Sequence, residues 1–346
     1  MPESVVGVNF DYTYNGTLES EVLFKPSVGT PSMDTFFRMV TGSKYKIQVP
    51  LVGNISNIIK KYASCARTFT DGIDITNTTV ELTQLELNMQ WCKDDFEQTL
   101  NVGNNLAEEM LRSGVDEFDP SGTQIQTIID NLVTDAARRD TFRIFSWGDT
   151  ADADTNWNQL DGLWTKLIAQ NTAANAYCVR RASTTLGTGT LAAGVALDSL
   201  KECYEESAII LKQLPKEQKY FAVTGTVYEN LLSSYEANSN ATELQFRNLT
   251  DGQGNSEAEL TYRGIRVIPI YAWDNDLNEP GNPLFGTAKH MILYTTRENH
   301  IVAADVAGDS ERVSGWYERK DRKYYIEGFQ RLGYNLIHCD LQTIAY

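Results

Sequence analysis

Residues 121–147, SGTQIQTIIDNLVTDAARRDTFRIFSW, carry the longest sustained helical pattern in the chain. Apolar side chains recur along this stretch at the spacing that places them on one face of a helix. The positions that form this stripe are Ile125, Ile128, Ile129, Leu132, Val133 and Ala136. Ser121 or Thr123 can cap the start of the helix, and Gly148 follows the expected end. The pattern therefore predicts one long helix that ends near Phe145.

The chain before this helix has a different pattern. Residues 1–42 mix polar residues, glycine and proline with isolated apolar anchors, which predicts an extended arm that packs on a neighbour. Residues 44–49 and 79–87 are rich in β-type residues, and the turn signal Asp71-Gly72 lies between them, so we expect a long two-stranded β-excursion. A helix is expected over residues 94–113.

The chain after the long helix alternates between helices and strands. After a polar link at residues 149–156, the apolar spacing predicts a short helical region at 157–168, a helix over 191–214 that Pro215 ends, and a helix capped by Thr224. Residues 237–259 have the polar, turn-rich composition of an exposed loop. The expected strands are 220–223, 264–270, 291–294, 301–304, 323–326 and 333–337. This order of elements predicts an α+β protein with projecting arms.

Composition limits the function classes. The chain has 346 residues and 42% hydrophobic positions, enough for two compact domains, and its 46 acidic and 30 basic residues give a formal charge of −16. That charge argues against a protein whose whole surface is adapted to nucleic acid. No stretch has the length and hydrophobicity of a membrane-spanning helix, and residues 1–6 do not resemble a secretory signal, so we expect a cytoplasmic protein. The five cysteines are widely spaced, so we expect them to be reduced.

The chain offers few residues for catalysis or for cofactor binding. His290, His300 and His338 lie beside no nucleophile motif, so no catalytic residue is assigned. Residues 187–192 match the G-x-G-x-x-G/A nucleotide fingerprint, but residues 180–185 before them are too polar for the buried strand that this fingerprint requires. We therefore interpret residues 187–192 as a flexible lead into a helix and expect no cofactor.

One acidic stretch resembles part of a calcium loop. Residues 152–156, DADTN, begin such a loop, but Trp157 occupies the position that needs glycine and Leu163 the position that needs a bidentate glutamate. We interpret the stretch as a solvated acidic linker, and no metal site is assigned.

Because no single site stands out, the order of the elements carries the information. That order resembles the Hong Kong 97-like coat fold of the major capsid proteins of tailed bacteriophages. Residues 158–163, NQLDGL, are similar to the L-x-G-L turn that follows the long spine helix of this family. Residues 262–269, YRGIRVIP, are similar to its "G, apolar, x, V, x, x, P" strand, and Phe285-Gly286 resembles the return towards its peripheral domain.

The resemblance implies a division of the chain into five parts. Residues 1–42 would be the N-terminal arm, 43–78 the extended β-loop, 79–173 the peripheral domain with the spine helix, 174–290 the axial domain, and 291–346 the return to the peripheral domain.

The resemblance also implies a function. The chain would be a major capsid protein without enzyme activity that assembles into the pentamers and hexamers of an icosahedral shell enclosing double-stranded DNA. Its partners would be copies of itself, portal and scaffolding proteins, a decoration protein where one is used, and packaged DNA bound without sequence specificity. It would need no membrane, and it would be found in the virion capsid after assembly in the host bacterial cytoplasm.

Two groups of basic residues are the candidate assembly contacts. The β-loop group is expected to meet acidic patches on neighbouring subunits and consists of Lys44, Lys46, Lys60, Lys61 and Arg67. The spine-helix group consists of Arg138, Arg139 and Arg143, and its members lie near one another on the helix. These three arginines have two open interpretations, namely contact with packaged DNA and contact with acids of a neighbouring subunit.

Two other functions remain as alternatives. An encapsulin-like compartment shell would have the same fold but would load protein cargo instead of a genome. A nucleotide-binding enzyme built around residues 187–192 belongs to a different class, and nucleotide binding measured by calorimetry would reveal it.

Overall fold

The computed structural model describes residues 33–42, 45–52, 75–92, 124–171, 179–237, 243–250, 256–305 and 313–346. These residues form two compact units, which are described separately. In the smaller unit lie residues 86–92, 124–137 and 313–329, and the remaining described residues form the larger unit.

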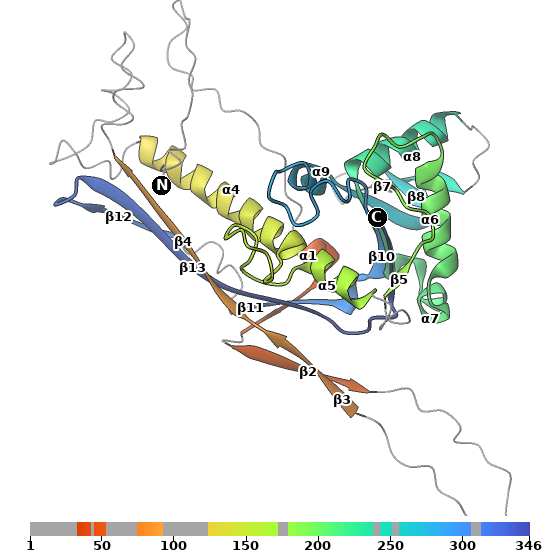
Figure 1. The fold of residues 1–346 in the computed structure, drawn as a ribbon, viewed down its shortest axis with the longest axis horizontal. Coiled ribbons are helices and arrows are strands. Elements are labelled where there is room, and N and C mark those ends of the chain that lie inside the picture. Colours follow the sequence, from red (N-terminus) through yellow and green to blue (C-terminus); the bar gives the residue numbers. More distant parts are fainter. Residues whose placement is uncertain are drawn as a thin grey trace, which may run out of the picture. The chain divides into compact units, whose positions relative to one another are not determined.

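The larger unit is built on a seven-stranded mixed sheet with the strand order β5-β14-β10-β6-β9-β8-β7 (Figure 1). Its strands are β5 Arg180–Arg181, β14 Gln342–Ala345, β10 Ile292–Thr296, β6 Lys219–Thr224, β9 Ile265–Ile270, β8 Ser256–Tyr262 and β7 Leu244–Thr250. Strands β6 and β9 are parallel, whereas β10 is antiparallel to both of its neighbours, β6 and β14. The sequence predicted β6 and β9 correctly, because both are short apolar runs.

The central strands of this sheet are buried on both faces, which explains their nearly continuous apolar sequence. In β6, Tyr220 and Ala222 point into one hydrophobic core, whereas Phe221 and Val223 point into another. The same alternation occurs in β10, where Leu293 belongs to the first core. The sheet therefore separates two cores, and each core is closed by helices.

Helices cover both faces of the sheet. The core that contains Phe221 is closed by α6, Val195–Glu206, and α8, Gly225–Ala237. The core that contains Tyr220 receives side chains from α5, Leu163–Gln170, from α9, Tyr271–Leu277, and from the last residues of α4, Gln124–Trp147. The short helices of the unit are α1 Met33–Phe36, α7 Ile209–Gln213 and the 3₁₀ turns Lys216–Gln218 and Arg297–Asn299.

Two further sets of strands belong to the larger unit. Strand β1, Arg38–Thr41, runs parallel to β11, His300–Ala304, and β11 pairs antiparallel with residues 332–336 of β13. Strands β2, Lys46–Val52, and β3, Ile75–Glu81, form an antiparallel ribbon in which Lys46 is opposite Glu81. This ribbon confirms the predicted two-stranded excursion near its base. Residues 53–74, most of the predicted arm and the predicted helix over 94–113 lie outside the described residues.

The smaller unit has its own hydrophobic core between strands and the first half of α4. Its strands are β4 Thr83–Cys92, β12 Val313–Glu318 and β13 Lys323–Leu336, of which residues 86–92, 313–318 and 323–329 lie in this unit. Ile129 and Val133 of α4 pack against Trp91, Tyr324 and Ile326, and the Trp91 and Tyr324 rings are 5.6 Å apart. The predicted long helix is thus confirmed, and Ile129 and Val133 of its apolar stripe pack on strands, whereas Leu132 is exposed.

Three sequence predictions are wrong in their details. Residues 191–214 form two helices, α6 and α7, because Ser207 and Ala208 between them have extended backbone angles. Residues 244–250 and 256–262 form the hairpin β7–β8 instead of an exposed loop, since Leu244 and Leu260 alternate with polar residues and are buried in the core. The two strands predicted at 323–326 and 333–337 are parts of one strand, β13.

The predicted cap of α8 is also wrong. The Thr224 hydroxyl accepts a hydrogen bond from the Met291 N–H instead of capping the helix. The Asp274 carboxylate of α9 caps the helix from a distant part of the sequence, because it accepts hydrogen bonds from the N–H groups of Gly225 and Thr226.

The turn after α4 requires glycine at two positions. The Gly148 N–H donates to the Ile144 carbonyl at 2.8 Å, and the Gly162 N–H donates to the Gly148 carbonyl at 2.8 Å, which closes the loop between α4 and α5. A Cβ atom added to Gly162 would lie 2.7 Å from the Phe145 carbonyl oxygen. Backbone atoms cannot rotate away from such a contact, so only glycine fits.

We expect Gly162→Ala to lower the free energy of unfolding by on the order of 1–3 kcal/mol, since overpacking against fixed backbone cannot relax. Thermal unfolding of purified protein measures this effect. Gly189→Ala is the matched control, because a Cβ atom at Gly189 meets nothing within 4 Å. Equal melting temperatures for the two variants would contradict the close packing of this turn.

Candidate functional site

The predicted β-loop bases lie mostly outside the described residues. Lys44, Lys60, Lys61 and Arg67 are in this group, so their placement stays a prediction. Lys46 is described: it is the first residue of β2, it is exposed, and it pairs in register with Glu81. The one described member of the group thus lies at the base of the ribbon, beside an acid of the same chain.

The spine-helix arginines differ in exposure. Arg138 and Arg139 are exposed near the end of α4. The Arg143 side chain is only 17% exposed, and its guanidinium lies 3.5 Å from the Glu279 carboxylate and 3.7 Å from that of Asp140. It also lies 4.8 Å from the centre of the Trp157 ring. Arg143 therefore connects α4 to two other segments of its own chain.

The end of α4 packs into a cluster of tryptophans. The rings of Trp147 and Trp164 are stacked at 6.1 Å, and Trp273 meets Trp164 edge-on at 5.4 Å. The Trp273 indole N–H donates to the Ser146 hydroxyl at 3.1 Å. Trp164 lies in the short helical region predicted over residues 157–168, whereas no local pattern indicates that Trp273, more than a hundred residues later, completes the cluster.

A buried carboxyl group lies at the edge of this cluster. The Trp147 indole N–H donates to Asp276 Oδ2 at 3.0 Å, and Asp276 is only 4% exposed. Burial raises the pKa of Asp276 to about 6, although the Trp147 hydrogen bond and the nearby Arg143 charge act in the opposite direction. Asp276 was not among the predicted site residues. The available signal was its position in the sequence: it lies in the polar triplet 274–276 (DND), between the apolar-aromatic run 270–273 (IYAW) and Leu277.

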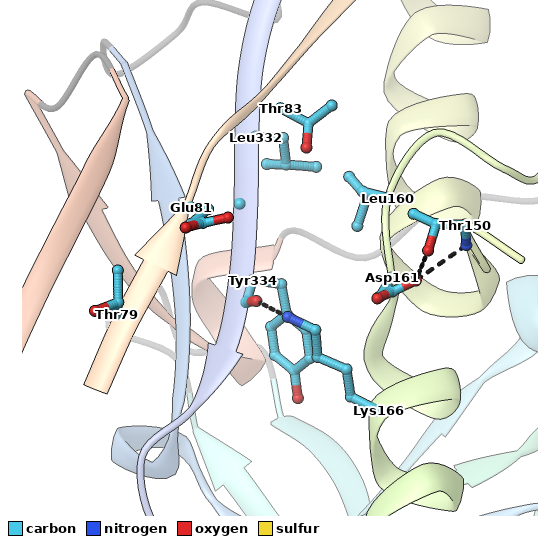
Figure 2. A pocket seen from close by; sticks show the side chains of 10 residues that line it. Thr79, Glu81, Thr83, Thr150, Leu160, Asp161, Lys166, Leu332 and Tyr334 are labelled. Atoms are coloured by element: carbon cyan, nitrogen blue, oxygen red, sulfur yellow. Dashed lines mark hydrogen bonds between the residues drawn. The ribbon is translucent and has the colours of Figure 1, made fainter. Parts of the chain in front are cut away.

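A polar hollow of about 330 Å³ lies in the larger unit. Figure 2 shows Lys166 reaching across it towards Tyr334, with Glu81 and Asp161 on opposite walls. The Lys166 amine donates to the Tyr334 carbonyl oxygen. Burial lowers the pKa of Lys166, and the charges of Asp161 and Glu81 partly offset this effect. The amine is thus used as a hydrogen-bond donor that holds β13 against α5.

Asp161 has a structural task in the same hollow. Its carboxylate accepts hydrogen bonds from the Thr150 N–H at 3.0 Å and from the Thr150 hydroxyl at 2.7 Å (Figure 2). These bonds fix the loop that follows α4, which also contains the calcium-loop-like residues 152–156. In that stretch the carboxylates of Asp152 and Asp154 accept hydrogen bonds from backbone N–H groups two residues further on. Within the part of the chain that the structure describes, no group of three or more acids, histidines or cysteines could hold a metal ion.

The nucleotide-like residues 187–192 form a loop that is held in place. Before it the strand β5 has only two residues, and α6 begins only at Val195. The His290 ring lies 2.7 Å from the Gly189 carbonyl oxygen, and the Asn230 amide donates to the Ala192 carbonyl. The loop therefore differs from the strand-turn-helix geometry that a nucleotide fingerprint requires.

The other histidine that is buried has a role in packing. His300 hydrogen-bonds through its two ring nitrogens with the hydroxyls of Thr295 and Tyr334, both at 2.9 Å. Burial lowers the pKa of His300 to about 3, so the ring stays neutral. His338 is exposed.

The cysteine prediction is correct only in part. Cys92 and Cys203 are free thiols, and Cys203 is fully buried, which raises its pKa. Cys339, however, is disulfide-bonded, so the expectation that all five cysteines are reduced is wrong. Among the described helices, none has both the length and the apolar character needed to cross a bilayer.

Comparison with known proteins identifies the fold. No protein-family model and no curated protein matches the sequence. The structure is similar to a chain of the capsid of Myoviridae phage XM1, with a TM-score of 0.58 and 10% identity over 95% of this chain and 96% of that one. It is also similar to a chain of Mycobacterium phage Che8, with a TM-score of 0.53 and 11% identity over 97% and 98% of the two chains. A chain of Microbacterium phage Oxtober96 gives a TM-score of 0.52 and 13% identity over 96% and 95%. The predicted α+β fold of the Hong Kong 97 kind is confirmed.

We expect Asp276→Asn to stabilise the protein at pH 7.5 and to have little effect at pH 4. The carboxyl holds its proton more tightly in the folded state, so the wild type loses stability as the pH rises from about 4 through 6. The amide can still accept the Trp147 hydrogen bond without being charged, and the gain is on the order of 3 kcal/mol at most. Urea unfolding followed by tryptophan fluorescence at both pH values measures it.

Glu217→Gln, which removes an exposed carboxylate, is the control for this variant. An Asp276→Asn protein that is less stable than the wild type at pH 7.5 would show that the charged carboxylate is required at this position.

Proposed function

We propose that this chain is the major capsid protein of a tailed bacteriophage, a coat subunit that forms the pentamers and hexamers of an icosahedral shell around double-stranded DNA. The observation that carries the proposal is the fold, which matches a chain of the phage XM1 capsid along nearly its whole length. The proposed protein acts by repeated contact between copies, without a catalytic step. It is located in the virion capsid.

The β2–β3 ribbon supports an assembly role. A two-stranded ribbon is only marginally stable by itself in water. At its base, Val80 is buried, and Ile47 and Val49 pack with Ile301 and Ala303 of β11. Other ribbon residues, such as Lys46, are exposed. A ribbon that continues beyond such a base would gain stability from a surface supplied by a neighbouring copy, so its ordering would be coupled to assembly.

We assign the five parts of the chain on the same basis. Residues 1–42 would be the arm, 43–78 the extended loop, 79–173 the peripheral domain, 174–290 the axial domain and 291–346 the return. The seven-stranded sheet supports the axial assignment in part: five of its strands, β5 to β9, lie between residues 180 and 270, whereas β10 and β14 come from residues 291–346.

The basic residues would make the contacts between copies. For the loop group, Lys44, Lys46, Lys60, Lys61 and Arg67, the partners would be acidic patches, which a chain with a formal charge of −16 offers in number. Arg138 and Arg139 would face either acids of a neighbour or packaged DNA, and we favour acids for the same reason. Arg143 already has two acidic neighbours in its own chain, so its contribution would be to hold α4 in position.

Portal and scaffolding proteins, together with a decoration protein where one is used, would complete the set of partners. An encapsulin-like compartment shell is the alternative with the same fold, and its lumen would contain a cargo protein instead of DNA.

The first test is assembly of the full-length chain. We expect shells, tubes or capsomer rings in negative-stain electron microscopy after size-exclusion chromatography, with salt or a crowding agent added to drive association. Coexpression with the neighbouring genes should give shells that protect DNA from nuclease. Shells that hold only a protein cargo would support the compartment alternative, and a small monodisperse particle in all conditions would contradict both.

A second test concerns Arg139, which is exposed on α4 and whose charge also acts on Asp276 of the same chain. We expect Arg139→Glu to weaken assembly by on the order of 1 kcal/mol per contact, because the new charge would repel acids of the next copy. The assembled fraction in size-exclusion chromatography measures it, and Arg139→Lys is the control that keeps the charge. Normal assembly with less retained DNA would favour the DNA interpretation instead.

A further inference from the structure

Helix α7 presents two isoleucines to solvent. Ile209 is 72% exposed and Ile210 is 46% exposed, whereas the next residue, Leu211, is completely buried. The buried Lys219 amine donates hydrogen bonds to the Leu211 carbonyl at 3.1 Å and to the Lys212 carbonyl at 2.9 Å. These bonds hold the end of the helix, so α7 cannot rotate to hide its isoleucines. The pair forms a fixed apolar projection, which we name the isoleucine patch.

A second exposed apolar group lies on β7, an edge strand of the seven-stranded sheet of the larger unit. Phe246 of β7 is 39% exposed, and its ring meets the Tyr235 ring of α8 edge-on, with 5.0 Å between the centroids. Strand β7 is the outermost strand of the seven-stranded sheet, so it has no partner on its outer side within the described residues. Phe246 and Tyr235 together are named the aromatic patch.

The two patches lie apart on the larger unit. Tyr235 belongs to the last turns of α8. Figure 1 shows α8 and α7 at opposite ends of the seven-stranded sheet and the helix α6 that covers it. One chain therefore cannot bring its own two patches together. Two copies related by a rotation can do so, and a contact between different patches of identical chains is the kind that closes into a ring.

Charged side chains of both signs lie beside the patches, and Glu236 is the exposed neighbour of Tyr235. Glu205 and Glu206 precede the isoleucine patch, and Arg247 follows Phe246. All three are exposed, and none makes an ion pair within the described part of the chain. Arg180 donates to the Glu206 carbonyl and Lys212 to the Glu205 carbonyl, so these two bases lie close to the acids and offset part of their charge. The acids on one side and the arginine on the other remain available for a partner.

We propose that the isoleucine patch of one copy docks on the aromatic patch of the next copy, with Glu205 and Glu206 facing Arg247 across the contact. This inference rests on the proposed function and specifies one of the contacts within each ring. The apolar pair would supply the buried centre of the contact, and the charges would fix its register.

A cross-linking experiment tests the direction of the contact. In assembled full-length protein, Ile209→Cys together with Phe246→Cys should give a ladder of covalent oligomers with a short bis-maleimide. Each single variant should give no ladder, and it also serves as the control for the native cysteines. A mixture of the two single variants should give dimers only. Ladders or dimers from Ile209→Cys alone would show that α7 packs on itself and would overturn the proposal.

A charge exchange tests the register without relying on cysteines. Arg247→Glu should lower the assembled fraction by on the order of tenfold, and adding Glu205→Arg with Glu206→Arg should restore most of it. Circular dichroism and the elution volume of the unassembled protein check that each variant is folded. Normal assembly of Arg247→Glu, or no rescue by the exchange, would overturn this contact while wild-type shells still support the proposed function. A wild type that never assembles would overturn both.

Discussion

The burial of β6, β10 and β14 on both faces is the constraint on which the larger unit depends. Alternate side chains of these strands enter two different cores, so most of their positions are apolar. A one-residue shift of β6 would exchange Phe221 with Ala222 between the cores and leave a cavity in one and a clash in the other. The register of the sheet therefore fixes where α6 and α8 can pack on one face and where the tryptophan cluster can pack on the other.

Buried polar side chains connect the helices and strands of the larger unit through hydrogen bonds. The Lys219 amine holds the end of α7, the Lys166 amine holds β13, and the Asp276 carboxyl receives the indole N–H of Trp147. Each of these groups reaches a partner that is distant in the sequence or at the end of a short helix. A buried polar group is costly without such a partner, so each bond stabilises one arrangement of the chain over its alternatives. A surface that is held rigid in this way loses little conformational entropy when it meets a partner.

On the surface of the larger unit, apolar side chains are exposed, in contrast to the buried polar groups of its interior. Several apolar side chains remain exposed, among them Ile209 and Ile210 of α7 and Phe246 of β7. Under the proposed function, a contact between different patches of identical copies can close into a ring.

The sequence by itself determined the elements whose signal is local. The long helix, the strand at 219–224 and the antiparallel ribbon follow from apolar spacing over ten to twenty neighbouring residues, and their order was sufficient to predict the fold. Tertiary structure decided what depends on distant residues: that Asp274 caps α8 instead of Thr224, that residues 244–262 form a hairpin because a core receives Leu244 and Leu260, and that Arg143 is held by Glu279. It also decided which apolar residues remain exposed. Periodicity reports which side of an element is apolar, but only the packed chain shows whether another element covers it.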